Sequence, residues 1–309
     1  MKAHASCKFK FKVTVMAMML MGSLASQVQA QGAAWQPPEP LRVSDAIFSE
    51  PHDIALSPDG LYLFVADKGH NAVEIVVPGS LEPIGQLGSG TFASPHDIAF
   101  DKRGRVYVAD TGNGRISVWK FDGVTKYAGV LAEFVEEWSD GIEKPTSIAL
   151  STGGRAYVTD VHANALLVID NGVVTQRVTR IDGVALDHPH DVGVGSDGSI
   201  YLTDPGNDRI VILNPDLSLN RILDKTTHGF EAPKYLGLDG DDMLFVADKT
   251  NDRIRMLSGG GEFIHTGDID GSIATDGLNG PKGFAVDGRY IWVSDTRNNR
   301  IILLRRKPR

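Results

Sequence analysis

The sequence has almost no cysteine: among its 309 residues the single thiol belongs to Cys7. A disulfide framework is therefore excluded, and burial of apolar side chains alone must stabilise the folded chain. Long apolar runs are almost as scarce, and Val13 to Leu24 is the one clear example. This run is too short to cross a bilayer as a helix.

The surroundings of this apolar run are typical of a secretory signal peptide. Four lysines between residues 2 and 12 form a basic start, and Val28-Gln29-Ala30 supplies a small-residue cleavage site. We therefore expect residues 1–30 to be a cleaved signal peptide and residues 31–39 to be a linker. The exported protein is expected in the periplasm or outside the cell.

Positive charge is the third scarce feature. The chain carries 31 Lys and Arg against 39 Asp and Glu, and four of the basic residues but no acidic one fall within residues 1–30. The remainder thus has 27 basic and 39 acidic residues, a formal net charge of −12. This balance argues against nucleic acid and anionic membranes as partners and leaves small molecules and proteins open.

The sequence does contain a sixfold repeat. Each copy begins with a Pro, continues as an apolar strand, turns, and ends a second strand in Asp. The copies begin at Pro51, Pro95, Pro145, Pro189, Pro233 and Pro281, and the closing acids are Asp67, Asp110, Asp160, Asp204, Asp248 and Asp295. A period near 45 residues with several short strands is typical of a β-propeller blade. The sequence therefore predicts an all-β fold, a six-bladed β-propeller over residues 40–309.

The second copy shows the strands expected in each blade. Runs rich in β-branched and aromatic residues, separated by Gly, Asn and Asp, predict strands at 96–100, 105–109, 116–120 and 126–134. The last copy has only three such runs before the chain ends. Leu41 to Phe48 is a strand-like segment ahead of the first copy. We expect it to supply the missing outer strand and so to close the ring.

A turn motif, Asp-x-x-Asn-x-Arg, follows the closing acid in four copies, as at Asp204, Asn207 and Arg209. Asp and Asn satisfy backbone groups in turns and Arg pairs with carboxylates, so a structural role accounts for the motif. Copies 1 and 3 lack the Arg and carry a His in the turn, His70 and His162. Departures from a repeat's own rule are candidates for function.

Histidines gather where the first strand of a blade begins. Copies 1, 2 and 4 read Pro-His-Asp, and their histidines are His52, His96 and His190. Three imidazoles around one channel suit Zn²⁺, so these are the predicted metal ligands. The acids that follow are Asp53, Asp97 and Asp191. They are expected either to support the metal site, with Ca²⁺ as a second ion, or to hydrogen-bond the backbone of a neighbouring blade.

The same ring position holds Thr146 in copy 3 and lysines in copies 5 and 6, Lys234 and Lys282. Lys68 and Lys249 add cations in the nearby turns. One side of the channel mouth therefore suits a metal and the other an anion such as a carboxylate. The predicted ligand is a small molecule or peptide with an anionic group, bound by Lys234, His70 and Lys249; solvated surface lysines are the alternative.

These repeats resemble NHL repeats over essentially all of residues 40–305. Among enzymes, the nearest resemblance is to peptidyl-α-hydroxyglycine α-amidating lyase, a six-bladed propeller that holds zinc and calcium. His96, Thr146 and His190 reproduce the series of Pro-His, Pro-Thr and Pro-His blades of that family. The resemblance places its third zinc histidine at Lys282, its catalytic Tyr at His162 and its catalytic Arg at Lys68.

Two functions of different classes remain open. If the resemblance extends to activity, the protein is a metal-dependent carbon–nitrogen lyase. Zinc on His96, His190 and His52 acidifies a substrate hydroxyl, His162 takes the proton, and Lys68 or Lys282 holds a carboxylate. Alternatively, the propeller is not catalytic and binds a peptide, a sugar or a protein partner. Sugar-lactone hydrolysis needs a Glu/Asn/Asp calcium set that the sequence does not provide at this mouth.

Overall fold

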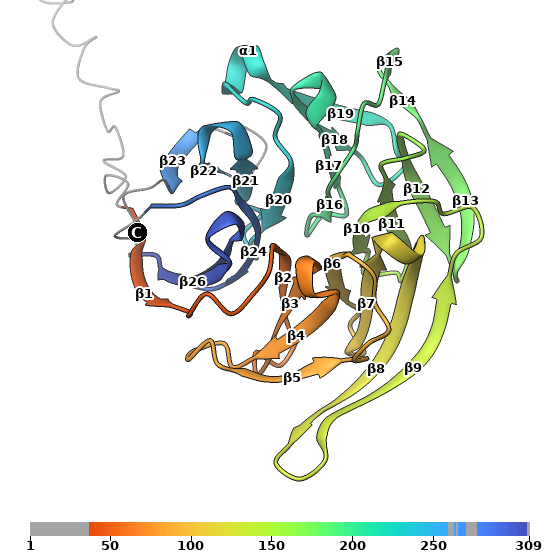
Figure 1. Ribbon diagram of the computed structural model, residues 1–309. Coiled ribbons are helices and arrows are strands. Elements are labelled where there is room, and N and C mark those ends of the chain that lie inside the picture. The colour runs from red at the N-terminus through yellow and green to blue at the C-terminus, as the bar shows by residue number, and fades with distance from the viewer. Residues whose placement is uncertain (1–36, 259–262, 264, 270–276, 308–309) are drawn as a thin grey trace, which may run out of the picture. The chain divides into compact units, whose positions relative to one another are not determined.

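The computed structural model describes residues 37–258, 263, 265–269 and 277–307. In these residues six four-stranded antiparallel sheets stand around a common axis (Figure 1). The prediction of an all-β, six-bladed β-propeller is therefore confirmed. The predicted signal peptide and residues 31–36 of the predicted linker lie outside the described residues.

Within each of the first five blades the strands follow one another from the axis outward. Blade 1 consists of β2 (Pro51–Leu56), β3 (Leu63–Asp67), β4 (Ala72–Val76) and β5 (Pro83–Leu87). Blade 2 consists of β6 (Pro95–Phe100), β7 (Arg105–Asp110), β8 (Arg115–Thr125) and β9 (Gly129–Trp138). Blade 3 consists of β10 (Pro145–Leu150), β11 (Ala156–Asp160), β12 (Ala165–Asp170) and β13 (Val173–Val178).

The remaining blades repeat this order. Blade 4 consists of β16 (Val192–Val194), β17 (Ile200–Asp204), β18 (Arg209–Leu213) and β19 (Leu219–Asp224). Blade 5 consists of β20 (Tyr235–Leu238), β21 (Leu244–Asp248), β22 (Arg253–Leu257) and β23 (His265–Ile269). Blade 6 consists of β24 (Pro281–Asp287), β25 (Tyr290–Asp295), β26 (Arg300–Arg305) and β1 (Glu39–Val43).

Within the residues that the structure describes, helical structure is confined to short turns. A two-stranded ribbon, β14 (Arg180–Ile181) and β15 (Val184–Ala185), follows blade 3, and α1 (Lys225–His228) follows blade 4. The 3₁₀ turns that follow closing acids are Lys68–His70, Thr111–Asn113, Pro205–Asn207, Lys249–Asn251 and Thr296–Asn298. No helix within the described residues has both the length and the apolar character that a membrane span requires.

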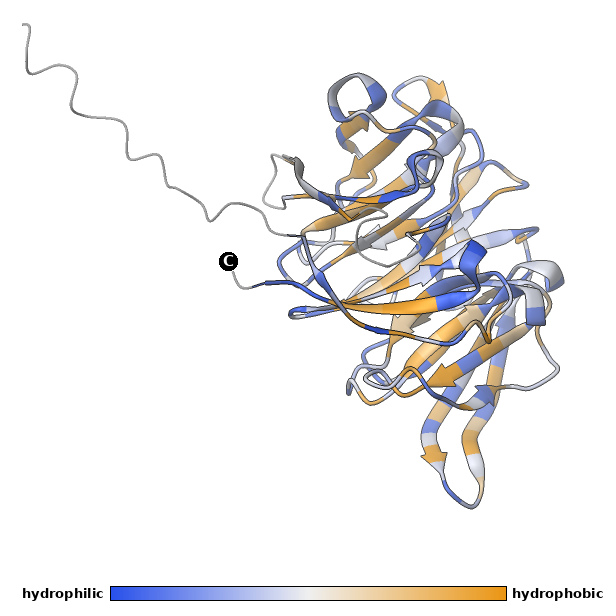
Figure 2. Ribbon diagram, turned by 60° about the vertical axis from the view of Figure 1, so that its left-hand side comes forward, coloured by the Kyte–Doolittle hydropathy of each residue, from blue (hydrophilic) through white to orange (hydrophobic). Residues whose placement is uncertain are grey.

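The core lies between neighbouring blades. Every residue of β3, β17 and β21 is buried, because both faces of these strands pack against the next sheet. Such strands read in the sequence as short apolar runs bounded by turn residues. Figure 2 shows apolar residues along the strands and polar residues at their ends. In one layer of the core, Tyr107 and Val118 of blade 2 pack with Ile148 and Leu167 of blade 3.

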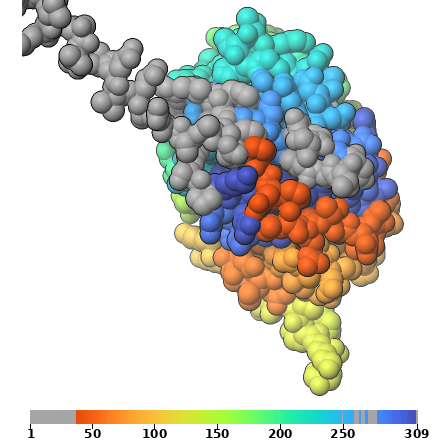
Figure 3. Space-filling model, turned by 90° about the vertical axis from the view of Figure 1, so that its left-hand side faces the viewer, coloured from red at the N-terminus to blue at the C-terminus, as the bar shows by residue number. Residues whose placement is uncertain are grey.

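Closure of the ring joins the two ends of the propeller. β1 pairs antiparallel with β26 and is the outer strand of blade 6, as the sequence predicts, and Figure 3 shows the two ends side by side. The strand is shorter than the predicted Leu41–Phe48 segment and ends at Val43. Phe48 is buried instead in the core between blades 6 and 1. The N-terminal segment thus contributes both a strand and a core side chain.

The outer hairpin of blade 2 differs from the prediction. β8 continues to Thr125, so Lys126 to Ala128 form a turn where the sequence pattern predicts a strand. Val124 and Val130 pack against the core between blades 1 and 2, and Tyr62 Oη accepts a hydrogen bond from the Val124 N–H at 3.3 Å. These contacts with blade 1 explain the longer strands. The tip projects beyond the blades (Figure 3).

The closing acid of every blade is fully buried and has the same partner. Its carboxylate accepts a hydrogen bond from a backbone N–H that lies two residues before the repeat's Pro. The donors are Ser49, Ala93, Glu143, Asp187, Glu231 and Asn279, at 2.7–3.2 Å from the acid of their own blade. Because a buried carboxylate must be satisfied, this bond fixes the loop ahead of each innermost strand.

The predicted structural role of the turn motif is confirmed. In blade 4 the second oxygen of Asp204 accepts from Asn207 Nδ2 at 2.8 Å and from Arg209 Nε at 2.7 Å. The Asp–Asn and Asp–Arg bonds recur in blades 2, 5 and 6. In blade 1, His70 replaces the Asn, and its Nδ1 lies 2.8 Å from Asp67 Oδ2.

A further contact ties each of five blades to the next one around the ring. A residue with positive φ at the end of the turn accepts from a backbone N–H of the following blade at 2.7–3.0 Å. These residues are Asn71, Asn164, Asp208, Asp252 and Asn299. Asn and Asp tolerate the left-handed region that the turn requires. In blades 1 and 3 the Asn comes four residues after the closing acid instead of three, and it therefore stands at this position.

Substitution of Asp204 by Ala is expected to lower the free energy of unfolding by about 3–5 kcal/mol, because the variant leaves the buried Arg209 cation without its carboxylate. Urea unfolding followed by circular dichroism measures this change. Asp216→Ala is the matched control in the same blade: Asp216 is exposed and bonds only Ser218. A loss at Asp204 no larger than at Asp216 would contradict the assigned role.

Candidate functional site

The first residues of the six innermost strands surround one end of the axis. In blades 1 and 2 the Pro of the repeat pairs across its sheet with the closing acid, Pro51 with Asp67 and Pro95 with Asp110. Hydroxyl groups then link neighbouring blades: Thr146 Oγ1 donates to His190 O at 2.8 Å. The position after the Pro is therefore fixed relative to its neighbours. Its six residues are His52, His96, Thr146, His190, Lys234 and Lys282.

The three ring histidines lie close together. The ring centroids of His52 and His96 are 4.6 Å apart, and those of His96 and His190 are 6.0 Å apart. Tyr235, which follows Lys234, adds a fourth ring with centroids 4.7 Å from His190 and 6.1 Å from His52. One end of the channel is thus lined by four aromatic rings and the two lysines of blades 5 and 6.

Hydrogen bonds define the tautomer of His52. Its Nδ1 lies 2.8 Å from Glu50 O, and a carbonyl only accepts, so Nδ1 carries the proton. Its Nε2 lies 2.8 Å from Lys282 Nζ and accepts from that amine. Burial, followed by the positive charge of Lys282, lowers the pKa of His52 well below its usual value. His52 is therefore a neutral imidazole whose two nitrogens are both engaged.

His96 and His190 have more open hydrogen-bonding arrangements. His96 Nδ1 donates to Ser94 O at 2.9 Å, which leaves the Nε2 lone pair directed elsewhere. Burial lowers the pKa of His96 to about 4. Burial, then Lys234, also lowers the pKa of His190, whose buried Nδ1 has no hydrogen-bond partner among the described residues. Both imidazoles are neutral at pH 7 and present unused nitrogens to the channel.

The acids that follow the histidines link neighbouring blades. Asp97 Oδ2 accepts from the Ile148 N–H at 2.7 Å, and Asp191 Oδ2 accepts from the Leu236 N–H at 2.7 Å. These are the backbone bonds that the sequence gives as one of two alternatives. In blade 6 the equivalent residue is Gly283, where an added Cβ would lie only 2.4 Å from Asp53 Oδ1. Glycine thus leaves room for the Asp53 carboxyl.

This layer gathers carboxyl groups whose pKa values are raised. Burial, then the Asp97 carboxylate, raises the pKa of Asp53 well above its usual value. The same two causes raise the pKa of Asp191 to about 7. Burial, then Asp191, raises the pKa of Tyr235, whose hydroxyl has no hydrogen-bond partner among the described residues. The channel therefore has a cationic mouth above a layer of carboxyl groups.

The predicted metal ligands are not grouped as a metal site among the described residues, and the metal site stays a prediction. Across the described residues, no group of three or more His, Cys, Asp or Glu side chains is placed to hold a metal ion. Zinc requires a nitrogen lone pair from each histidine, whereas the Nε2 lone pair of His52 accepts from the Lys282 amine. The Asp97 and Asp191 oxygens already accept backbone N–H groups. We assign no metal ligand, and the Zn²⁺ and Ca²⁺ sites stay predictions from the histidine and aspartate pattern and from the resemblance.

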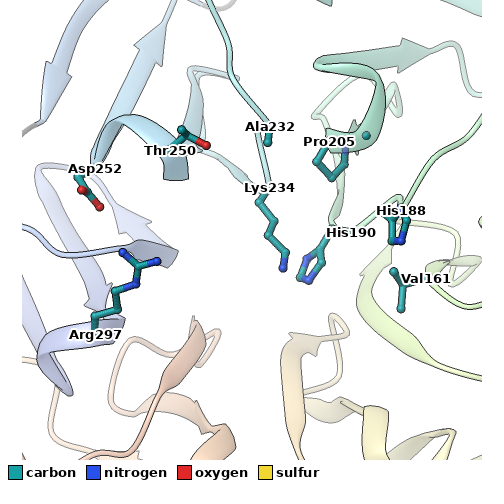
Figure 4. A pocket seen from close by; sticks show the side chains of 10 residues that line it. Val161, His188, His190, Pro205, Ala232, Lys234, Thr250, Asp252 and Arg297 are labelled. Carbon is teal, nitrogen blue, oxygen red and sulfur yellow. The ribbon is translucent and has the colours of Figure 1, made fainter.

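A pocket of about 580 Å³ opens beside the channel mouth. Its lining comes from four blades and combines cations, one acid and an apolar wall. The lining residues are Val161, His188, His190, Pro205, Gly206, Ala232, Lys234, Thr250, Asp252 and Arg297. In Figure 4 the Lys234 side chain and the His190 ring point toward one another, with Arg297 and Asp252 across the pocket from Val161 and His188.

The turn residues predicted from the sequence have partners of their own. Lys68 forms an ion pair with Glu50 at 2.9 Å, and its charge contributes to the lowered pKa of His96. The His162 side chain is 72% exposed and pairs with Glu143 at 2.7 Å. His70 performs the structural role of the Asn in the turn motif. Lys249 begins a 3₁₀ turn, and its side chain lies outside the described part of the structure.

Some residues of the site were missed by the sequence reasoning. Arg297 and Asp252 lie in the turns after closing acids. In the sequence, residues of these turns are explained by a structural role, so neither was predicted to belong to the site. Tyr235 follows Lys234 and so occupies the repeat position that holds Asp53, Asp97 and Asp191 in blades 1, 2 and 4. That departure from the Pro-His-Asp pattern was a signal that could have identified it. His188, which is exposed and pairs with Asp187, gave no comparable signal.

The fold and the channel define the class of this protein: it is a six-bladed β-propeller whose inner strands present polar side chains at one end of the axis. Comparison with known families then gives the kind of repeat. The NHL repeat family matches residues 92–119, which run from the start of blade 2 into β8. The chain is a six-bladed β-propeller whose second blade contains an NHL repeat.

Solved structures support the fold. Virginiamycin B lyase from Staphylococcus aureus is 15% identical, with 83% of this chain and 80% of that chain covered at a TM-score of 0.57. A protein of unknown function from Bacteroides thetaiotaomicron is 15% identical, with 89% and 73% covered at 0.64. The β-propeller domain of Cps50 (Swd1) from Myceliophteria thermophila is 9% identical, with 88% and 100% covered at 0.61. At these identities the similarity concerns the fold alone.

The burial of His96 predicts acid sensitivity. Between the unfolded pKa of about 6.5 and the folded pKa of about 4, the unfolded chain binds a proton that the folded chain does not. The stability contributed by neutral His96 is therefore complete above pH 6.5 and is lost as the pH falls toward 4. Urea unfolding at pH 7 and 4.5 should show wild type losing about 2 kcal/mol more than His96→Gln. A pH-independent difference between the two proteins would contradict the assigned burial.

Proposed function

We propose that this propeller binds a small molecule or peptide with an anionic group in the pocket at the channel mouth. The observation that carries the proposal is the convergence of Lys234, His190 and Arg297 on one pocket from three blades. A carboxylate is the natural partner because lysine and arginine donate charge-assisted hydrogen bonds to it. The pocket's apolar wall, Val161 and Pro205, suits a ligand that carries a hydrocarbon part.

The electrostatics of the mouth favour an anion over a cation. Lys234, Lys282 and Lys68 each contribute to the lowered pKa of His96, which reports positive potential at the imidazole. Burial in low dielectric strengthens that potential. A bound carboxylate would relieve it and would also accept from a protonated histidine. Neutral ligands gain no such compensation, so charge is the expected basis of discrimination.

Carbon–nitrogen lyase activity is a second candidate function, favoured by His96. Its Nδ1 proton is held by Ser94 O, and its neutral state leaves an Nε2 lone pair that can take a proton from a substrate. In this form of the proposal His96 takes the role that the sequence gives to His162. No step requires the predicted zinc or calcium.

The proposed setting of this activity follows from the N-terminal sequence. Residues 1–30 have the order of a cleavable signal peptide, so the mature propeller is proposed to function in the periplasm or outside the cell. A protein surface is a further possible ligand there, because a terminal carboxylate of a peptide carries the same charge as a free acid.

The anion site predicts a difference between an acid and its amide. N-acetylglycine is expected to bind at least about tenfold more tightly than N-acetylglycinamide, and Lys234→Gln should lower the affinity for the acid about tenfold. NMR titration measures both constants. Lys120→Gln, which removes an exposed lysine on blade 2, is the matched control and should bind as wild type does. Equal binding of acid and amide, or no effect of Lys234→Gln, would reject the site.

Lyase activity predicts glyoxylate release from an α-hydroxyglycine test peptide. Release should persist after dialysis against a metal chelator and fall at least about tenfold in His96→Gln. A colorimetric glyoxylate assay measures the rate. If no glyoxylate forms, or if His96→Gln is as active as wild type, this second candidate fails while the anion site can still stand.

A further inference from the structure

We propose that Lys282 is an amine nucleophile that captures carbonyl compounds as an imine at the channel mouth. The observation is its contact with a histidine from another blade: Lys282 Nζ lies 2.8 Å from His52 Nε2. Lys282 is the second residue of β24 and His52 is the second residue of β2, so the pair joins blade 6 to blade 1. The side chain of Lys282 is half-buried and therefore accessible from the mouth.

The direction of this hydrogen bond follows from the surroundings of His52. The Nδ1 proton of His52 is held by Glu50 O at 2.8 Å, so Nε2 is the nitrogen that bears a lone pair. The imidazole is 3% exposed, and its orientation is fixed between the Glu50 carbonyl and the amine. Nε2 therefore holds the Lys282 amine in a fixed position without taking its proton, since burial and the Lys282 charge lower the pKa of His52.

Further positive charge surrounds the pair. Lys68 and Lys282 both act on the His52 imidazole, and Lys234 holds the same ring position in the adjacent blade. An amine next to other cationic groups and partly removed from water is the setting in which a lysine becomes a nucleophile.

The reaction balances without another reactant. The ammonium of Lys282 gives one proton to solvent water, and the freed Nζ lone pair forms a bond to the carbonyl carbon. The carbonyl oxygen takes up two protons, one returned by the solvent and one from the nitrogen, and leaves as water when the carbon–nitrogen double bond forms. An ammonium and an aldehyde or ketone thus give a protonated imine and one water molecule.

The substrate class follows from the neighbours of Lys282 and rests on the proposed anion site. A compound that presents a carboxylate beside its carbonyl would place that carboxylate toward Lys234 while the carbonyl carbon meets Nζ. We therefore infer an α-oxo acid or a short aldehyde acid as the preferred class. An uncharged aldehyde lacks the carboxylate and should react with the same amine more slowly.

Reductive trapping tests the inference on the full chain. Wild-type protein is incubated with pyruvate or with propionaldehyde in the presence of cyanoborohydride, which reduces an imine to a stable secondary amine. Peptide mapping by mass spectrometry then locates the label. Lys282 should be labelled at least about tenfold faster than the exposed Lys120 in the same sample, and pyruvate should exceed propionaldehyde.

Three variants make the assignment specific. Lys282→Arg keeps the positive charge but cannot form an imine, so the label at this position should disappear. Lys102→Arg, which changes an exposed lysine of blade 2 outside the site, is the matched control and should retain the Lys282 label. His52→Gln should slow labelling at Lys282 with both carbonyl compounds. Thermal unfolding confirms that each variant is folded before it is compared.

The outcomes separate this inference from the proposed function. If N-acetylglycine binds but neither carbonyl compound labels Lys282 faster than Lys120, the nucleophile is rejected and the anion site stands. Labelling by propionaldehyde without N-acetylglycine binding supports the amine and rejects the anion site. Labelling of Lys234 in place of Lys282 overturns the assignment.

Discussion

One interaction, the buried carboxylate at the end of each blade's second strand, determines the rest of the structure. It accepts the backbone N–H two residues ahead of the repeat's Pro in all six blades, at 2.7–3.2 Å. A carboxylate without water must be satisfied, and its bonds to Asn and Arg complete its shell in four blades. The innermost strands consequently begin in one fixed register.

This constraint turns a structural repeat into a site. Because the loop ahead of each innermost strand is fixed by the same bond, the side chain after the Pro occupies an equivalent place in every blade, whatever its chemistry. The chain places imidazoles on one part of that ring and amines on the other, over a layer of carboxyl groups. Burial keeps the imidazoles neutral, so the lysines and Arg297 supply the positive charge of the mouth.

The ring of blades could be predicted from the repeat period of about 45 residues. The strands could be predicted because strands that are buried on both faces appear as short apolar runs between turn residues. The gathering of His52, His96 and His190 follows from the same repeat. The partner of His52 could not be predicted, because side-chain rotamers decide whether His52 faces a metal or the Lys282 amine. Tyr235 and Arg297 gather with them only through the tertiary structure. The hairpin of blade 2 is longer because Val124 and Val130 pack on blade 1, a contact that a single-blade pattern does not contain.

The account rests on positive potential at the channel mouth that an anion neutralises. The most direct measurement is the pKa of His96, followed by NMR of its imidazole protons with and without N-acetylglycine. Without ligand the pKa should lie near 4, and saturating acid should raise it by about one unit, because a nearby carboxylate stabilises the imidazolium. A pKa that stays unchanged or falls in the presence of the acid would contradict the account.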